Sequence, residues 1–246
     1  IVQTKIARHS SLEGSEKTHG SPLGNDVIAE LRKTLEWAHE PFVIPAEVYD
    51  HCTEAMQRGV EAHRTWKVSL EQYFKANAGK EDMWNSCIQV GLPKEVVASE
   101  LMQFDKDLAG RDASGIVLNR LNAAIPNMFG GSADLGSSNK SVLSGESYFS
   151  ADDRAGKNIH FGVREFAMGA IANGIALHGG LRPFVATFFV FSDYLRAAVR
   201  MSALMHRSVM YVLTHDSIGV GEDGPTHEPI EHFAAFRAMP NTQMFR

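Results

Sequence analysis

The stretch from Thr214 to His232, THDSIGVGEDGPTHEPIEH, gathers side chains that can carry out chemistry. It contains three histidines among carboxylates, glycines and prolines. Histidine and carboxylate side chains donate, accept and relay protons near neutral pH. The glycines and prolines favour turns over a helix or strand. The sequence therefore predicts a polar, irregular loop that binds or transforms a ligand.

Two simple chemistries do not fit this stretch. A helical zinc pair needs two histidines four residues apart, whereas His227 and His232 are five apart and Pro229 lies between them. We therefore expect no metal ligands here. The chain has no Gly-x-Ser-x-Gly motif of a nucleophilic serine. GGSADLGSSN could bind a phosphate through backbone N–H groups, but alone it is a weak indication.

Two further motifs each allow a structural and a functional interpretation. FGVREF places Glu165 in the first turn of an expected helix. Its carboxylate could interact with the helix dipole, or it could be a buried acid whose pKa is raised so that it shares a proton. TFFVFSDY sets Phe188, Phe191 and Tyr194 three residues apart. These rings could pack in the core or hold a flat heterocycle. Spacing alone leaves both choices open.

The elements that must position these residues alternate between helices and strands after Arg111. We expect helices at 115–125, 164–179 and 191–206, strands within 127–135, 182–189 and 208–216, and a long polar loop at 137–158. Apolar strands between helices predict a parallel sheet covered on both faces. Such sheets bind ligands at the carboxyl ends of their strands. We expect a turn at 223–225 and Thr226 as the cap of a helix after Pro229.

The first part of the chain has a different pattern. We expect a short strand within 1–12, a helix capped by Asn25, and a second helix opened by Pro45. The second helix carries a stripe predicted to face a core, with His63 packed within it: Val48, Cys52, Met56, His63, Trp66, Leu70 and Phe74. Residues 76–110 are charged and weakly patterned, which is typical of an interdomain linker.

Composition narrows the class of protein. The chain has 246 residues, 44% hydrophobic and 22% charged, which is ordinary for a globular protein. Its net charge of −5 gives no general attraction to nucleic acid or an anionic membrane. It shows neither a signal peptide nor a membrane-spanning run, so we expect the cytoplasm. Because the chain begins at Ile1 without a methionine, we expect a fragment of a longer protein.

Four motifs together resemble one enzyme family. GGSADL–SSN, FGVREFAMGA, TFFVFSDY and THDSIGVGEDGPTH occur in the order and spacing of transketolases. These thiamine-diphosphate enzymes move two-carbon ketol units between sugar phosphates. The resemblance implies an α/β fold of parallel sheets flanked by helices, covering parts of two domains. We expect the end of the diphosphate-binding domain at 1–78, a linker at 79–110, and an incomplete pyrimidine-binding domain at 111–246.

The resemblance implies cofactor contacts. Glu165 matches the glutamate that hydrogen-bonds N1′ of the aminopyrimidine and favours its imino tautomer, whose nitrogen removes the C2 proton of the thiazolium. Phe188, Phe191 and Tyr194 match residues that hold the pyrimidine ring. Asp134 matches an acid near the cofactor at the dimer interface. The metal is expected to be Mg²⁺ or Ca²⁺, with its ligands outside this chain, because the family's Gly-Asp-Gly motif is absent and should precede Ile1.

The resemblance also implies substrate contacts. The matched residues are Arg111, Ser138, His215, Asp223, His227 and His19. An arginine fork suits a phosphate dianion, and a hydroxyl and an imidazole add donors beside it. Asp223 would bind a sugar hydroxyl. His227 near the donor's reactive carbons, and His19 near the cofactor diphosphate and the acceptor aldehyde, are the expected catalytic proton relays.

The implied reaction is reversible ketol transfer from xylulose 5-phosphate to ribose 5-phosphate, a step of the pentose phosphate pathway. In this family the active site forms between two chains, so a homodimer is expected. The close alternative is dihydroxyacetone synthase, with formaldehyde as acceptor. A different class is a non-catalytic partner subunit that kept the fold.

Overall fold

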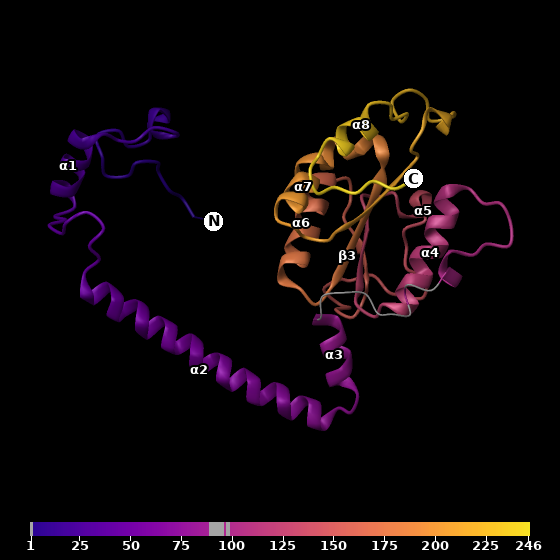
Figure 1. The fold of residues 1–246 in the computed structure, drawn as a ribbon, viewed down its shortest axis with the longest axis horizontal. Coiled ribbons are helices and arrows are strands. Elements are labelled where there is room, and N and C mark those ends of the chain that lie inside the picture. Colours follow the sequence, from indigo (N-terminus) through magenta and orange to yellow (C-terminus); the bar gives the residue numbers. More distant parts are fainter. Residues whose placement is uncertain (1, 89–95, 97–98) are drawn as a thin grey trace. The chain divides into compact units, whose positions relative to one another are not determined.

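The computed structural model describes residues 2–88, 96 and 99–246. The chain forms two compact units, Ile1–Ala76 and Asn77–Arg246 (Figure 1). Each unit has its own secondary structure and is described by itself. The expected domain bounds and the bounds of the linker remain predictions, and part of that linker lies outside the described residues.

The first unit is helical. Its elements are η1 (Glu16–Thr18), α1 (Asn25–Thr34) and α2 (Ala46–Ala76). The strand predicted within 1–12 is wrong: residues 2–5 have no regular structure and turns follow. An extended segment needs a partner strand for its backbone groups. The described part of this unit offers none.

The helix starts of this unit differ from their predictions by one residue. Gly24, not Asn25, is the N-cap of α1, with φ of 83°. Glycine adopts this left-handed value without strain. Pro45 precedes α2 instead of occupying its first position, and its carbonyl oxygen accepts from the N–H of Val48 at 3.1 Å. A proline here costs the helix no hydrogen bond, because its first N–H groups have no partner inside the helix.

The predicted core-facing stripe of α2 is also wrong. No residue of α2 is buried, and Cys52 is exposed. His63 is exposed and stacks on Trp66 with 5.8 Å between ring centroids. An amphipathic helix buries its apolar face only where another element packs on it, and no described element of this unit covers this face. Among the described residues, no helix combines the length and apolar character needed to cross a membrane.

The second unit alternates helices and strands. Its elements are α3 (Lys80–Ile88), η3 (Ser99–Met102), α4 (Gly110–Ala124), β1 (Met128–Ser132), α5 (Gly136–Asn139), β2 (Asn158–His160), α6 (Glu165–His178), β3 (Arg182–Phe188), η4 (Phe189–Phe191), α7 (Ser192–Leu204), β4 (Met210–Thr214), η5 (Ile218–Val220) and α8 (His232–Arg237). The three helices and three strands predicted after Arg111 are confirmed as α4, α6, α7, β1, β3 and β4.

These strands form one parallel sheet in the order β2-β1-β3-β4. Two glycines let β1 fit between its neighbours. A Cβ on Gly130 would lie 1.9 Å from the carbonyl oxygen of Phe184, and one on Gly131 would lie 2.0 Å from that of Ile159. Only glycine avoids these overlaps. The expected parallel sheet flanked by helices is confirmed.

Strand β2 was not predicted. It has three residues, and burial falls from Asn158 to the exposed His160. So short a polar strand shows neither an apolar run nor an alternation. Its pairing with β1, where Asn158 lies beside Gly130, holds it in the sheet. It therefore depends on tertiary contacts that no local pattern reveals.

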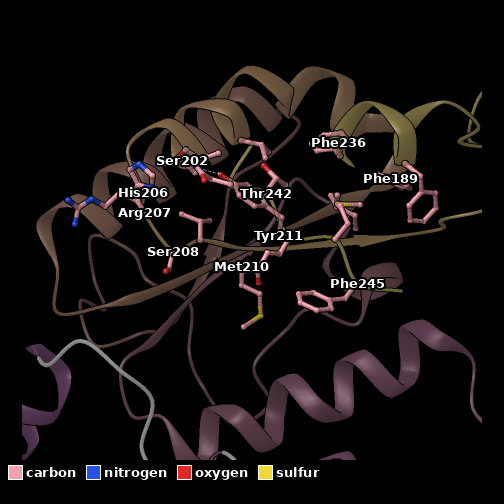
Figure 2. A pocket seen from close by; sticks show the side chains of 18 of the residues that line it. Phe189, Ser202, His206, Arg207, Ser208, Met210, Tyr211, Phe236, Thr242 and Phe245 are labelled. Atoms are coloured by element: carbon pink, nitrogen blue, oxygen red, sulfur yellow. Dashed lines mark hydrogen bonds between the residues drawn. The ribbon is translucent and has the colours of Figure 1, made fainter. Parts of the chain in front are cut away.

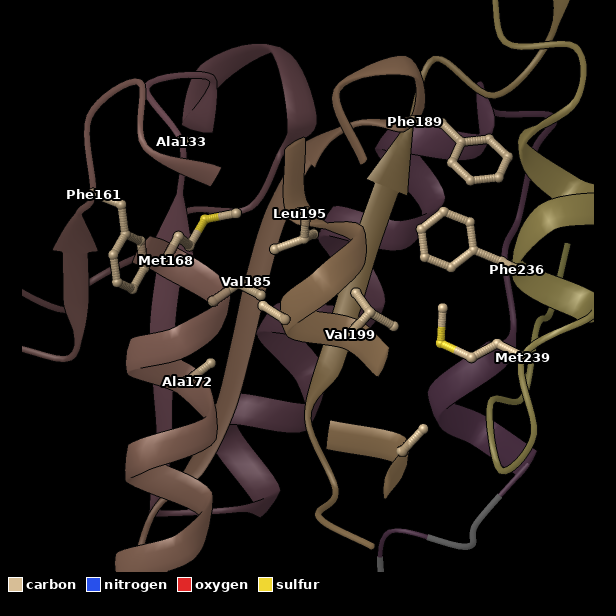
Figure 3. Close-up of a cluster of buried hydrophobic side chains, with 12 residues drawn as sticks. Ala133, Phe161, Met168, Ala172, Val185, Phe189, Leu195, Val199, Phe236 and Met239 are labelled. Carbon is tan, nitrogen blue, oxygen red and sulfur yellow. The ribbon is translucent and has the colours of Figure 1, made fainter. Parts of the chain in front are cut away.

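The sheet is covered on both faces (Figure 1). One buried cluster lies between the sheet and helices α6 and α7, and it includes Met168 of α6, Val185 of β3 and Leu195 of α7 (Figure 3). A second cluster includes Leu118 of α4 and Phe184 of β3. Burial of apolar area on both faces stabilises the sheet by roughly 25 cal/mol per Å² removed from water. The sheet is thus a rigid base for the loops at its carboxyl edge.

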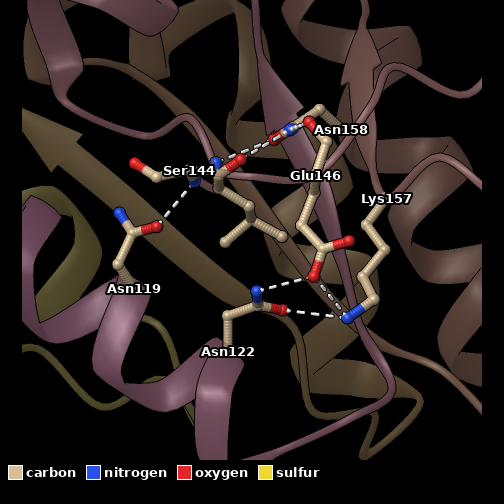
Figure 4. Close-up of polar contacts among 7 residues, drawn as sticks. Asn119, Asn122, Ser144, Glu146, Lys157 and Asn158 are labelled. Carbon is tan, nitrogen blue, oxygen red and sulfur yellow. Dashed lines mark hydrogen bonds and ion pairs between the residues drawn. The ribbon is translucent and has the colours of Figure 1, made fainter.

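The long polar loop before β2 is held by side-chain amides and an ion pair (Figure 4). The amide of Asn158 accepts from the N–H of Leu143 at 2.8 Å and donates to its carbonyl oxygen at 3.0 Å. Lys157 pairs with Glu146 at 2.7 Å, and Asn122 donates to the same carboxylate at 3.0 Å. The hydrogen bond from Lys157 is the main reason that the pKa of Glu146 is lowered. These contacts fix the loop that follows α5.

Candidate functional site

The candidate site lies where β3 and β4 end. The parallel register places Phe188, the last residue of β3, beside Thr214, the last residue of β4. His215 follows Thr214 with φ of 54°, a left-handed value that turns the chain at the strand end. The parallel sheet therefore brings the predicted site residues Phe188 and His215 together, although they lie far apart in the sequence.

Five rings form a continuous series here, called the aromatic cluster. The imidazole of His215 stacks on Phe188 with 3.6 Å between ring centroids. Phe188 stacks on Phe191 at 5.9 Å, and Phe191 contacts Tyr194 at 6.4 Å and His227 at 5.2 Å. Phe188 is 6% exposed and Tyr194 is 67% exposed. The cluster thus reaches from the buried ring of Phe188 to the solvent-exposed ring of Tyr194.

Arg111 and His215 meet at the edge of this cluster. Nη1 of Arg111, in the first turn of α4, lies 3.2 Å from Nε2 of His215. The pKa of His215 is lowered, first by burial and then by the charge of Arg111. His227 acts in the same direction, whereas Asp223 and Asp216 oppose it. The imidazole is therefore favoured in its neutral form.

Glu165 is the first residue of α6 and is only 7% exposed. The turn before it is closed by Arg164, which donates to the carbonyl oxygen of Phe161 at 2.9 Å. The positive end of the helix dipole stabilises a carboxylate at this position. A buried carboxylate at a helix start is compatible with both interpretations of FGVREF, so the choice between them remains open.

Asp134 and Ser138 follow β1. Asp134 is exposed and has φ of 63°. It lines a cavity of about 250 Å³, together with the stacked rings of Tyr148 and His160. Ser138 is half-buried on α5. These two residues lie at the carboxyl end of β1, as the sequence predicted for the GGSADL motif.

His19 belongs to the other compact unit. It is exposed and follows η1. The structure describes its place only within that unit, so its expected role beside the cofactor and substrate is not tested by the geometry.

The loop after β4 differs in one detail from its prediction. The turn at 223–225 is confirmed: Gly224 has φ of 73°, and the N–H of His227 donates to its carbonyl oxygen at 3.0 Å. Thr226 does not cap the next helix, because α8 begins at His232 with Glu231 as N-cap. The hydroxyl of Thr226 instead contacts Nδ1 of His227 at 2.8 Å.

His227 and His232 face different surroundings. His232 is buried, and its Nε2 lies 3.3 Å from Oδ2 of Asp193. This contact is within ion-pair distance but lacks the geometry of a hydrogen bond. His227 belongs to the aromatic cluster. The two histidines therefore have separate surroundings, as their five-residue spacing suggested.

The site also rests on residues that the sequence analysis did not single out. Asn139, at the end of α5, is fully buried. It donates to Oγ of Ser132 at 2.9 Å and accepts from Oγ1 of Thr214 at 2.5 Å. Thr214 in turn contacts Nδ1 of His215 at 3.0 Å. One signal was available: a hydroxyl at the buried end of a strand, directly before a candidate histidine, needs a partner.

A larger cavity, of about 610 Å³, lies elsewhere along β4 (Figure 2). Its lining includes Tyr211, Phe236 and Phe245. Burial raises the pKa of Tyr211, whose hydroxyl contacts that of Ser202 at 2.6 Å. None of the predicted site residues lines it. β4 is the last strand of the described sheet, so this cavity marks a sheet edge and not the carboxyl ends of the strands.

The open parallel sheet flanked by helices defines an α/β protein, a class that commonly binds ligands at the carboxyl ends of its strands. Residues 106–246 match the family model described as transketolase, pyrimidine binding domain. Residues 1–93 match the model described as transketolase, thiamine diphosphate binding domain. The chain belongs to the transketolase family, which confirms the resemblance and the expected fold.

Curated relatives are similar over nearly the whole chain. A transketolase of Halalkalibacterium halodurans is 47% identical over 249 residues, covering 100% of this chain and 37% of the relative. Transketolase 2 of Escherichia coli is 43% identical over 239 residues, covering 95% of this chain and 36% of the relative. The chain therefore spans little more than a third of the length of these relatives.

Solved structures give the same result. Transketolase from Leishmania mexicana matches with a TM-score of 0.89 and 38% identity, covering 97% of this chain and 36% of that one. A Pichia stipitis transketolase in complex with sedoheptulose 7-phosphate matches with a TM-score of 0.89 and 36% identity, covering 97% and 37%. These matches place the fold of this chain among transketolases.

Proposed function

We propose that this chain is the central part of a transketolase that transfers a two-carbon ketol unit from xylulose 5-phosphate to ribose 5-phosphate. The setting is the pentose phosphate pathway in the cytoplasm. The observation that carries the proposal is the contact between Arg111 and His215 beside the aromatic cluster. A cation that can bind phosphate, an imidazole and several aromatic rings meet at one edge of the sheet, which suits a phosphorylated substrate beside a heterocyclic cofactor.

The residues fit the pyrimidine half of thiamine diphosphate. The open end of the aromatic cluster, Phe191 and Tyr194, offers ring faces to a flat heterocycle. Glu165 offers a buried carboxylate that can hold a proton at the ring nitrogen N1′. When bound, the cofactor supplies the carbon nucleophile for ketol transfer. Asp134 would lie beside it, and we place the metal ligands outside this chain.

Arg111, Ser138 and His215 would hold the phosphate end of the sugar. The guanidinium donates two parallel hydrogen bonds to a phosphate, and it starts a helix that is fixed against the sheet through Leu118. The hydroxyl of Ser138 adds a third donor. Charge-assisted bonds of this kind contribute about 1.5–3 kcal/mol each. They would orient the reacting carbons at a fixed distance from the phosphate.

Asp223 and His227 would act closer to the reacting carbons. Both residues lie in the same loop, on either side of the turn at Gly224. Because this turn reverses the chain between them, both side chains can face one substrate. Asp223 would accept a hydrogen bond from a sugar hydroxyl. His227, held by Thr226 and Phe191, would relay a proton as the carbon–carbon bond breaks or forms. His19 would play the same role toward the acceptor aldehyde.

We propose that the partner is a second copy of the parent protein. Helix α6 exposes large apolar side chains: Phe166, Ile171 and Leu177. A surface helix usually keeps such residues on its buried face. An exposed apolar helix that starts at Glu165 supports an interface next to the cofactor, as expected for an active site formed between two chains. Neither nucleic acid nor a membrane enters the proposal.

Product analysis tests this function. The parent protein, with thiamine diphosphate and magnesium, is mixed with xylulose 5-phosphate and ribose 5-phosphate, and separately with xylulose 5-phosphate and formaldehyde. Formation of a seven-carbon sugar phosphate supports transketolase. Dihydroxyacetone formed from formaldehyde, without the seven-carbon product, would instead show a dihydroxyacetone synthase. No product with either acceptor would favour a non-catalytic subunit.

A further inference from the structure

A chain of hydrogen bonds with fixed directions runs beneath the candidate site. It begins at the carbonyl oxygen of Ala186 in β3, which can only accept. Oγ of Ser132 donates to this oxygen at 3.0 Å and accepts from Nδ2 of Asn139 at 2.9 Å. Because the amide nitrogen of Asn139 faces Ser132, its Oδ1 faces Thr214 and accepts from Oγ1 at 2.5 Å.

This series of hydrogen bonds determines the tautomer of His215. The hydroxyl of Thr214 has one hydrogen and gives it to Asn139, so toward His215 its oxygen can only accept. Nδ1 of His215 must therefore carry the proton. At the other side of the ring Nε2 faces Arg111, which can only donate. The contacts on both sides of the ring, with Thr214 at Nδ1 and Arg111 at Nε2, thus require the neutral Nδ1–H form with a lone pair on Nε2.

The charges around His215 agree with this form. A proton on Nε2 would point at the guanidinium N–H of Arg111 in α4, so Arg111 lowers the pKa of His215. His227, which lies in the loop after β4 as His215 does, also lowers this pKa. Asp223 and Asp216, also on this loop, oppose them. Phe188 of β3 covers one face of the ring and removes it from water. Burial and Arg111 outweigh the two carboxylates, since the pKa of His215 is lowered.

In this form His215 has no N–H left for a ligand. A phosphate dianion that draws Arg111 away from Nε2 would replace a positive neighbour by a negative one. We propose that binding of a phosphate monoester at Arg111 is coupled to uptake of one proton from solvent at Nε2 of His215. This inference rests on the proposed sugar-phosphate site and adds to it a positioning role for Asn139 and Thr214. The imidazolium then donates through Nε2 to the phosphate and through Nδ1 to Thr214.

The tautomer is measured first, in the ligand-free parent protein with ¹⁵N-labelled histidine. The Nδ1–H form is expected for the wild type and for Thr214→Ser, which keeps the hydroxyl. In Thr214→Val the Nδ1–H loses its acceptor, so the Nε2–H form gains population. A wild-type protein dominated by Nε2–H, or identical spectra for the serine and valine variants, overturns the proposal.

Proton uptake is then measured by titrating ribose 5-phosphate into the parent protein in two buffers of different ionisation enthalpy. At about pH 7.5 the phosphate is already dianionic and His215 is neutral, so about one proton per site is expected to enter. His215→Gln should abolish this uptake, whereas His206→Gln, at an exposed position, should leave it unchanged. No binding, or equal uptake in His215→Gln, overturns the proposal.

Turnover separates this inference from the function on which it rests. Uptake at His215 without any ketol-transfer product would support the proton coupling and contradict the proposed reaction. Product formation without proton uptake would support the proposed reaction and contradict the proton coupling.

Discussion

The imidazole of His215 stacks on Phe188 with 3.6 Å between ring centroids and 25° between ring planes. This contact joins the ends of two neighbouring strands and connects the core of the sheet to its site. Removing the ring of Phe188 should therefore affect both stability and the site. Phe188→Ala is expected to lower the free energy of unfolding by about 3–5 kcal/mol, since Phe188 is almost completely buried.

Urea unfolding of the parent protein measures this loss. Phe42→Ala is the control, because Phe42 is fully exposed, and its change should stay within about 0.5 kcal/mol. An equal effect of both substitutions would contradict the role of Phe188 as the buried anchor of the aromatic cluster.

The packing of α6 on α7 gives a second prediction. A Cβ on Gly169 would lie 2.5 Å from Cδ1 of Leu195 and 2.7 Å from Cβ of Ala198. Gly169→Ala should therefore destabilise the protein by about 1–3 kcal/mol through overpacking. Thermal unfolding of this variant tests the prediction, and an unchanged midpoint would contradict the close packing of α6 on α7.

The ion pair in the polar loop should make stability depend on pH. The pKa of Glu146 is lowered in the folded protein, chiefly by the hydrogen bond from Lys157. A lowered folded pKa means that the stabilisation is present above the unfolded pKa of about 4.3 and is lost as pH falls through the folded pKa. The wild type should therefore be more stable than Glu146→Gln at neutral pH, and this difference should shrink on acidification below about pH 4. A difference that does not change with pH would contradict the pairing.

Much of the second unit could be predicted from sequence because its signals are local. Apolar runs and helical periodicity indicated β3, β4, α6 and α7, and the segment NMFGGSADL indicated the position of β1. The three-residue strand β2 escaped because pairing alone makes it a strand. The stripe of α2 was misread because periodicity shows which residues share a face, but not whether another element covers that face.

The candidate site was also partly predictable, because several of its residues lie in local sequence motifs. Motifs indicated Phe188 and His215, and the parallel register explains why these two meet. Only the family resemblance implied Arg111, which reaches His215 from the first turn of α4. The hydrogen bond between Asn139 and Thr214 joins residues that are 75 positions apart, so no spacing rule could find it. The roles of the site residues remain predictions until variants are measured.

Arg111 should be specific for the phosphate of the substrate. Replacing it by glutamine removes a charge-assisted donor, which should raise KM for ribose 5-phosphate by roughly 10- to 100-fold. KM for glycolaldehyde, an acceptor without phosphate, should stay within about twofold. The pKa of His215 should rise in the same variant, because Arg111 lowers it in the wild type. Equal losses with both acceptors would indicate a general structural defect.

The most direct test of the account concerns Glu165. The initial rate of seven-carbon sugar phosphate formation is compared between the parent protein, Glu165→Gln and Glu47→Gln, the last an exposed control in the first turn of α2. If Glu165 holds a proton on the cofactor ring, its replacement should lower the rate by about 10²- to 10⁴-fold while the control keeps full activity. A Glu165→Gln protein that forms the product at the wild-type rate would contradict the proposed mechanism.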